Sequence, residues 1–254
     1  MPILDALLEQ VAENARGARP LDIHIGMYWT LVSVELEGKR RAGISSTLHG
    51  GDDDHHHGKR APVRAAGSLL ECSMVDLVGL ARSESLLEAS VGLATLNALL
   101  DVDVETCVEL NAADIIAERG AGQRVAIIGH FPFTPHIRKI AGTLWVLELN
   151  PGEGDVPAAR APELLPQADV VALTGTSLLN HTFDELITFC HPESYVVVLG
   201  GTTPLSPLLF ASGVDAISGT HIVNPVAARL SISQGATFKQ IRGKQLLTMF
   251  RQDV

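Results

Sequence analysis

The stretch VAIIGHFPF (residues 125–133) joins a short apolar run to a turn with one glycine, one histidine and two phenylalanines. The run has the length of a buried strand, and Gly129 stands where such a strand would turn towards a helix. A dinucleotide-binding turn carries further glycines that admit a pyrophosphate, whereas His130, Phe131 and Pro132 stand here instead. We therefore expect a strand of a parallel sheet without the usual phosphate cradle, and no ordinary NAD binding.

Apolar strands and helical segments alternate around this stretch. Near-continuous apolar runs such as YVVVLG (195–200) are typical of strands covered on both faces, so the rhythm predicts a doubly wound, mainly parallel α/β sheet. The expected strands are RVAIIGH (124–130), TLWVLELNP (143–151), ADVVALTGT (168–176), SYVVVLGG (194–201) and DAISG (215–219), and the expected helices lie near PHIRKIA (135–141), LLNHTFDELITFC (178–190) and SPLLFAS (206–212).

The first part of the chain has a different pattern, which predicts an α+β domain with a small antiparallel sheet. We place the domain boundary near residue 105, giving domains at 1–105 and 106–254. The pattern predicts a helix in ILDALLEQVAENA (3–15), a hairpin of DIHIGMYWTLVSVEL (22–36) with AGISSTL (42–48), and two helices in SLLECSMVDLVGLARS (68–83) and SLLEASVGLATLNALL (85–100), the second capped by Ser83.

Composition and charge exclude several classes of protein. Of the 254 residues 46% are hydrophobic and 19% charged, as in a globular protein, and the formal net charge of −10 with only a short basic run, GKRR (38–41), argues against a nucleic-acid surface. No apolar run is long enough to span a membrane, and the N-terminus lacks a signal-peptide layout, so we expect a cytoplasmic protein. Three separated cysteines predict reduced, mostly buried thiols.

The run DDDHHH (52–57) is rich in carboxylates and imidazoles. Consecutive residues cannot all point at one ion, and a loop without a core-forming pattern does not hold them in place. We interpret the run as a solvated loop, with a low-specificity cation site as the alternative.

Polar residues gather at the expected strand ends, where open parallel sheets bind their ligands. Small residues there expose the backbone, and hydroxyl, amide, imidazole and carboxylate groups stand beside them, a mixture suited to a polar ligand. The candidates are Gly129, His130, Phe131, Pro132, Glu148, Asn150, Thr174, Gly175, Thr176, Asn180, Thr202, Thr203 and Pro204.

Each of the most reactive candidates has a second interpretation. His130 is a candidate metal ligand or acid/base group, or it only fixes the turn. Glu148 stands where dinucleotide-binding folds place a ribose-binding acid, or it is an exposed carboxylate at a strand end. Thr95 and Asn97 lie in an apolar helix, so they either satisfy neighbouring backbone or face a cleft between the domains.

Taken together, four strings resemble an uncharacterised bacterial and archaeal family known for "putative heavy-metal chelation". The resemblance implies an enolase N-terminal-like domain, which would include IGMYWTLVSV (25–34), followed by a Rossmann-like domain, with a site between them that takes in Thr95, Asn97 and the strand-end candidates. The four strings are LATLNAL (93–99), VAIIGHFPF (125–133) with ELNP (148–151), LTGTSLLNHTFDEL (173–186), and VVVLGGTTPLSPLLFASGVDAISG (196–219).

The leading hypothesis is a protein that binds or handles a transition metal or its small-molecule chelate in the cleft between the domains, with His130 and Glu148 as ligands. Because no Cys/His cluster is present, a chelated metal fits better than a bare soft ion. The alternative is an enzyme that acts on a small polar or nucleotide-like substrate in the same cleft, and a purely structural module is the third possibility. A homodimer is the default expectation.

Overall fold

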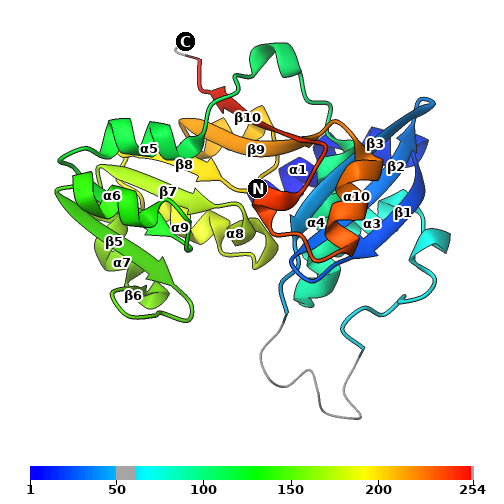
Figure 1. Ribbon diagram of the computed structural model, residues 1–254, viewed down its shortest axis with the longest axis horizontal. Helices are drawn as coiled ribbons and strands as arrows, with labels where there is room; N and C mark the ends of the chain where they lie inside the picture. Colours follow the sequence, from blue (N-terminus) through cyan, green and yellow to red (C-terminus); the bar gives the residue numbers. More distant parts are fainter. Residues whose placement is uncertain (50–60, 253–254) are drawn as a thin grey trace.

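The structure is a computed structural model that describes residues 1–49 and 61–252. It contains a seven-stranded sheet and a separate three-stranded sheet, which form the two halves of the molecule in Figure 1. The carboxylate and imidazole run at 52–57 lies outside the described residues.

The seven-stranded sheet confirms the mainly parallel α/β prediction. Its order is β10-β9-β8-β7-β4-β5-β6, and every neighbouring pair is parallel except β9 and β10. The edge strands β6 and β10 were not predicted. The strands are β4 (Arg124–Ile128), β5 (Thr143–Glu148), β6 (Val156–Pro157), β7 (Val170–Thr174), β8 (Tyr195–Leu199), β9 (Ala216–Ile222) and β10 (Lys244–Phe250).

Helices cover both faces of this sheet, as near-continuous apolar strands require. Side chains such as Val125 and Ile127 pack against α5 and α6 on one face, and their neighbours Ala126 and Ile128 belong to the core on the other face, which includes α7 and α9. The helices here are α5 (Ala112–Gly120), α6 (Thr134–Ile140), α7 (Ala161–Leu164), α8 (Thr176–Leu179), α9 (Phe183–Phe189) and α10 (Pro225–Ser233), with 3₁₀ turns at Val104–Thr106, Ala158–Arg160, Leu165–Gln167, Pro207–Ser212 and Phe238–Gln240.

The strand order reverses at β4. The chain runs from β4 to β5 on one side and then crosses to β7 on the other, so the carboxyl ends of β4 and β7 flank the topological switch point. In Figure 1 the carboxyl ends of β5 and β7 point towards the half of the molecule that holds the three-stranded sheet, and β4 runs parallel to both of them. This is the edge where open α/β sheets bind ligands.

The small sheet is antiparallel, as expected, but it has three strands where a two-stranded hairpin was predicted. The strands are β1 (Arg19–Ile25), β2 (Trp29–Leu36) and β3 (Lys39–Ser46). The prediction of one strand over 22–36 is wrong, because a tight turn at Gly26 divides this segment between β1 and β2. A Cβ on Gly26 would lie 2.8 Å from the Trp29 carbonyl oxygen and 2.7 Å from Ile232 of α10, so a side chain does not fit there.

Two helices from distant parts of the sequence enclose the small sheet. On one face Val32 and Val34 pack with α4 (Leu86–Leu99), and on the other Leu31 and Ile44 pack with α10. A continuous apolar core also joins α1 (Ile3–Gln10) and α4 to the seven-stranded sheet. The proposed boundary at residue 105 therefore divides segments that share one core.

Two predicted helices are interrupted. The segment 68–83 forms short turns around α3 (Met74–Gly79), and the N-terminal helix continues after Gln10 as α2 (Ala12–Gly17). Ser83 does not cap α4, which begins after Ser85; its hydroxyl instead accepts a hydrogen bond from the Ser85 amide. In the part of the chain that the structure covers, no helix combines the length and apolar character needed to cross a bilayer.

Gly43 of β3 gives a test of the contact between α4 and the small sheet. A Cβ there would lie 2.3 Å from the Ala94 carbonyl oxygen and 2.4 Å from the Ala98 amide nitrogen, both in the α4 backbone. Gly43→Ala should therefore lower the free energy of unfolding by about 1–3 kcal/mol, measured by urea denaturation. Gly79→Ala is the control, because Gly79 has helical φ and nothing lies within 4 Å of the added atom. Equal stability of both variants and the wild type would contradict this account of the contact.

Candidate functional site

The turn after β4 is fixed by its glycine. Gly129 has φ +96°, and its amide donates to the Leu147 carbonyl oxygen of β5 at 3.0 Å. A Cβ at this position would lie 3.2 Å from Cγ2 of Thr174 at the end of β7. Both the backbone conformation and the close approach favour glycine, and together they place His130 at the switch point.

His130 and Asp155 form the most distinctive pair at this edge. Nδ1 of His130 lies 3.6 Å from Oδ2 of Asp155, and the imidazole side chain is 60% exposed while the carboxylate is only 7% exposed. The same Oδ2 accepts a hydrogen bond of 3.0 Å from the Gly152 amide, which holds the turn between β5 and β6. The buried carboxylate therefore lies behind the exposed imidazole.

Glu148 completes the group from the end of β5. Burial raises the pKa of its carboxyl above the ordinary value, nearby His130 acts in the opposite direction, and nearby Asp155 raises it further. The three side chains are thus within electrostatic reach of one another. Within 1–49 and 61–252, neither Glu148 nor Asp155 forms an ion pair with an arginine or lysine.

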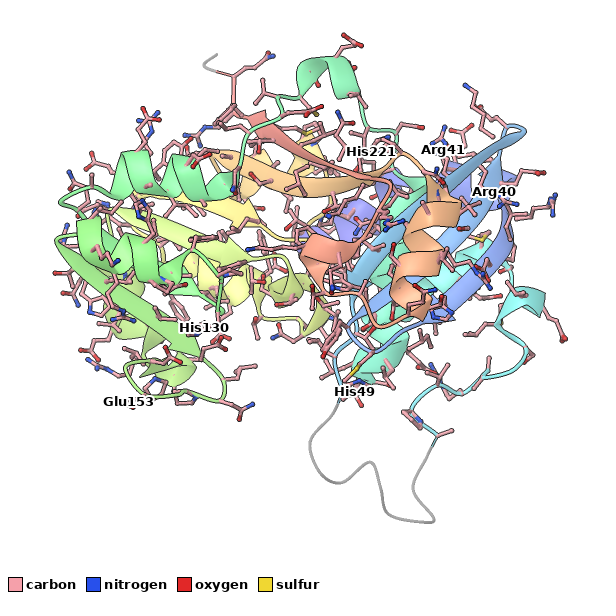
Figure 2. The ribbon with its side chains drawn as sticks, viewed as in Figure 1. Arg40, Arg41, His49, His130, Glu153 and His221 are labelled. Carbon is pink, nitrogen blue, oxygen red and sulfur yellow. The ribbon has the colours of Figure 1, made fainter. Side chains whose placement is uncertain are left out.

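Asp155 was missed by the sequence analysis. Its signal was the turn PGEGDV (151–156), in which an aspartate three residues after a glycine can accept that glycine's amide. Glu153 in the same turn is exposed, and Figure 2 shows it near the end of the sheet that carries His130. Two carboxylates, of Glu148 and Asp155, therefore lie near the imidazole of His130, and Glu153 lies exposed in the adjacent turn.

The hydroxyls at the end of β7 turn towards each other. Oγ1 of Thr174 lies 3.0 Å from Oγ1 of Thr176, and both side chains are partly buried. Gly175 packs against Thr203, since a Cβ there would meet its Oγ1 at 2.4 Å. Of these threonines, Thr174 lies beside Gly129, the residue before His130.

Phe131 and Phe133 serve the packing of the turn. Their rings stack with centroids 5.1 Å apart, and both pack against the core under α5 and α6. Pro132 and Asn150 are exposed beside them.

A second group of predicted site residues lies where the loop after β8 packs against α4 and the small sheet. Nδ2 of Asn97 donates to the carbonyl oxygens of Ile44 and Thr202, at 2.9 and 3.0 Å, and Oγ1 of Thr202 accepts from the Ser46 amide at 2.9 Å. Thr202, Thr203 and Pro204 are buried. The expected ligand-contacting loop therefore holds the two halves together.

Thr95 forms a hydrogen bond with neighbouring backbone, which was the first of its two interpretations. It is fully buried, and its hydroxyl donates to the Val91 carbonyl oxygen of its own helix at 2.8 Å.

Asn180 belongs to the turn between α8 and α9. Its Oδ1 accepts from the Thr182 hydroxyl at 2.7 Å, and the next residue, His181, has φ +62°. Nε2 of His181 lies 3.1 Å from the Ser83 carbonyl oxygen. Asn180 therefore shapes the break in the predicted helix 178–190.

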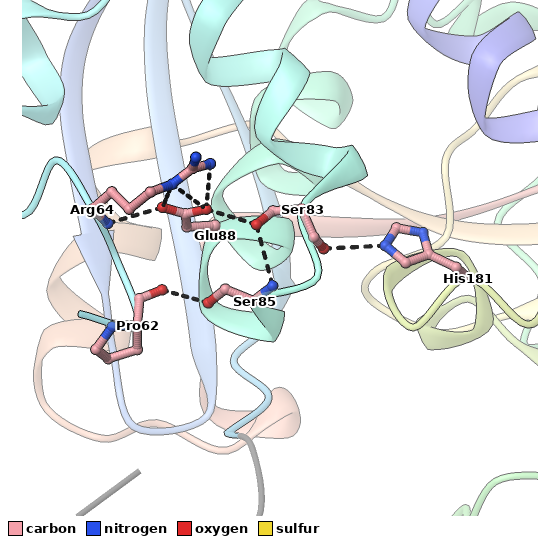
Figure 3. A network of polar contacts seen from close by, with 6 residues as sticks. All are labelled: Pro62, Arg64, Ser83, Ser85, Glu88 and His181. Carbon is pink, nitrogen blue, oxygen red and sulfur yellow. Dashed lines mark hydrogen bonds and ion pairs between the residues drawn. The ribbon is translucent and has the colours of Figure 1, made fainter. Parts of the chain in front are cut away.

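Figure 3 shows the network that His181 reaches. Glu88 of α4 accepts from the Arg64 guanidinium and from the Ser83 hydroxyl, and its side chain is only 3% exposed. The bonds from Arg64 hold the pKa of Glu88 at about 2. This network ties the segment after residue 60 to α4 and, through Ser83, to the α8–α9 turn.

A cavity of about 380 Å³ lies between α1 and the α8–α9 segment. Its lining includes Arg82, Asp5, His181 and the apolar Phe183. Neither His130 nor Glu148 lines it, so this cavity and the switch-point edge are separate places.

The donors at the switch-point edge do not make a complete metal site. Throughout 1–49 and 61–252, no three or more His, Cys, Asp and Glu residues stand in an arrangement that could hold a metal ion. One imidazole and nearby carboxylates suit a borderline first-row divalent ion rather than a soft one, which prefers thiolates. A metal here would need further ligands from water or from a chelator.

Comparison with known proteins finds two family models along the chain. The model DUF364, described as "Putative heavy-metal chelation", matches residues 111–250, and DUF4213, with the same description, matches residues 8–100.

Relatives are similar over nearly the whole length. An uncharacterized protein of Methanocaldococcus jannaschii is 24% identical over 250 residues, covering 95% of this chain and 93% of the relative. A DUF364 protein of unknown function from Pyrococcus horikoshii has a similar fold, with TM-score 0.82, 20% identity, and coverage of 98% of this chain and 100% of that one. Another, from Desulfitobacterium hafniense, has TM-score 0.81, 22% identity and 98% coverage of both chains. At these identities the two structures show the fold alone.

Glu88 gives a prediction for acid stability. Its native pKa of about 2 is below the ordinary 4.5, so its stabilisation is complete above pH 4.5 and is lost as the pH falls towards 2. Glu88→Gln should lower stability by about 1–3 kcal/mol at pH 7, and the difference from wild type should shrink at pH 3, measured by urea denaturation. A constant difference across this range would show that the charge of Glu88 does not stabilise the fold.

Glu148 gives a prediction of opposite sign. Its native pKa lies above 4.5, so the folded state has no charge penalty below that pH and loses stability as the pH rises through the native pKa. Glu148→Gln should therefore raise the melting temperature at pH 7 and leave it unchanged at pH 4, in metal-free buffer. Glu153→Gln, at an exposed position of the adjacent turn, is the control. A lower melting temperature for Glu148→Gln at pH 7 would contradict the prediction.

Proposed function

Because the chain belongs to the family described as "Putative heavy-metal chelation" (DUF364), we propose that it binds a transition metal, in chelated form, at the carboxyl edge of its seven-stranded sheet. His130 and Glu148 are the proposed ligands. The ligand lies between this edge and the half of the molecule that holds the three-stranded sheet, where the strand ends point (Figure 1).

The observation that carries the proposal is uncompensated negative charge at the switch point. Asp155 is nearly buried, Glu148 is partly buried, and within the described ranges neither has an arginine or lysine partner. Buried carboxylates without a cationic partner are costly, and a bound cation removes that cost. The position at the strand ends of an α/β sheet independently favours a ligand site.

The donor set supports a chelated ion rather than a bare soft one. Cys72, Cys107 and Cys190 lie on segments away from the switch-point edge, so nitrogen and oxygen are the donors available there. Such donors suit a first-row divalent ion. Because the protein offers too few ligands to fill the coordination shell, a chelator would supply the rest.

Native mass spectrometry with elemental analysis tests the proposal on untagged protein from its own host. A stoichiometric metal or metal-chelate mass should be present in the wild type and absent from the His130→Ala, Glu148→Ala double variant. The matched control is His191→Ala, Glu193→Ala, which removes one exposed imidazole and one exposed carboxylate. Both residues come just before β8, at the amino ends of the parallel strands. The same spectra give the oligomeric state, for which a homodimer stays the prediction.

Two results would overturn the proposal. A metal retained by the His130→Ala, Glu148→Ala variant would place the metal elsewhere. A metal-free organic mass lost in the same variant would instead favour an enzyme that acts on that compound, with His130 or Glu148 as its acid/base group.

A further inference from the structure

We infer that Asp155 is a positioning residue for His130: its carboxylate accepts the proton on Nδ1 and leaves Nε2 as the nitrogen that binds the metal. This inference rests on the proposed function and adds a division of roles between the carboxylates. Asp155 orients the imidazole, and Glu148 is the carboxylate that contacts the ligand.

The difference in exposure between the side chains of His130 and Asp155 is the basis for these two roles. Asp155 exposes 7% of its side chain and His130 exposes 60%, so a ligand that arrives from solvent meets the imidazole first. A carboxylate with so little exposed surface is less accessible to a hydrated or chelated ion than the imidazole is. Asp155 therefore acts through His130 and not on the ion directly.

The ring nitrogen nearest to Asp155 is Nδ1, at 3.6 Å from Oδ2. This separation is longer than a hydrogen bond, so the inference requires the exposed ring to rotate towards the carboxylate. Nδ1 is thus the nitrogen that lies close to the carboxylate, which leaves Nε2 for a ligand. A carboxylate on one ring nitrogen and a metal on the other is the usual arrangement around metal-binding histidines, because it fixes the tautomer and the ring orientation.

Asp155 is itself held rigidly. Its Oδ2 accepts the Gly152 amide at 3.0 Å, within the turn that joins β5 to β6. On the other side, Gly129 fixes the backbone before His130 through its amide bond to Leu147. The orienting group and the group that it orients thus come from two turns anchored on neighbouring strands, β4 and β5.

The tautomer of His130 can be measured without any metal. Nitrogen-15 NMR of the histidine-labelled protein at pH 8.5 should show the proton on Nδ1 in the wild type and in Glu153→Gln. In Asp155→Ala the proton should move to Nε2, the position that imidazole prefers in water. A His130 that carries its proton on Nε2 in the wild type would overturn the inference.

Zinc binding then tests the consequence, with Zn²⁺ alone as the diamagnetic probe in a competition titration. Asp155→Ala should bind Zn²⁺ about 10–100-fold more weakly than the wild type. Asp155→Asn keeps an oxygen that can accept both the Gly152 amide and the Nδ1 proton of His130, so it should retain the tautomer and bind more tightly than Asp155→Ala. Glu153→Gln, which removes an exposed carboxylate from the same turn, should bind as the wild type does. On zinc binding, the NMR signal of Nε2 should shift more than that of Nδ1.

The outcomes separate this inference from the proposed function. If Asp155→Ala binds Zn²⁺ as tightly as the wild type while His130→Ala does not bind, Asp155 has no positioning role and the metal site stands. If Nδ1 is the nitrogen that shifts, the assigned roles are wrong. If the wild type itself does not bind Zn²⁺, the assignment of Nε2 as the metal-binding nitrogen fails, whereas the NMR result still decides whether Asp155 holds the ring. The chelated metal of the proposed function is tested separately by the mass spectra.

Discussion

The enclosure of the small sheet between α4 and α10 is the contact on which the arrangement of the molecule depends. Leu31 and Ile44 would face solvent if α10 were absent, and Gly43 lets the backbone of α4 approach β3 closely. In the sequence, α10 directly follows β9 of the large sheet. When α10 packs on the small sheet, it therefore also fixes the relative orientation of the two sheets. The apolar driving force for this contact is sizeable, since each fully buried aliphatic side chain contributes about 1.5–3 kcal/mol.

Hydrogen bonds then fix the relative position of α4, β3 and the loop after β8, where the two halves meet. Asn97 and Thr202 link α4, β3 and the loop after β8 through hydrogen bonds to backbone groups. Apolar packing alone does not fix such a position, because it is not directional, whereas buried polar groups need specific partners. These residues thus hold together the halves between which we propose that the ligand lies.

The chemistry at the switch point comes from a different part of the fold. A parallel sheet brings the ends of β4 and β5 together, and the short turn to β6 returns Asp155 to the same place. The result is an edge with more carboxylate than compensating charge, built on rigid strands. The DUF364 family model, which matches residues 111–250, includes all of these residues.

The sequence by itself determined the large parallel sheet and the position of its strand ends. Apolar runs such as YVVVLG and the alternation with helices depend on local periodicity, which is present in the chain before it folds. Single strand-end residues such as His130 and Glu148 could be named for the same reason. The turn at Gly26 and the break at His181 were not predicted, and residues distant in the sequence, Ile232 and Ser83, lie close to them.

Only the tertiary structure decided which polar residues meet. Thr202 and Thr203 look like an exposed loop in the sequence, but burial against the small sheet gives them a role where the two halves meet. Asp155 is one aspartate in a glycine-rich turn until the turn places it 3.6 Å from His130. Local pattern sets the strands and helices, whereas the pairing of side chains across turns depends on how those elements pack, and that information is distributed over the whole chain.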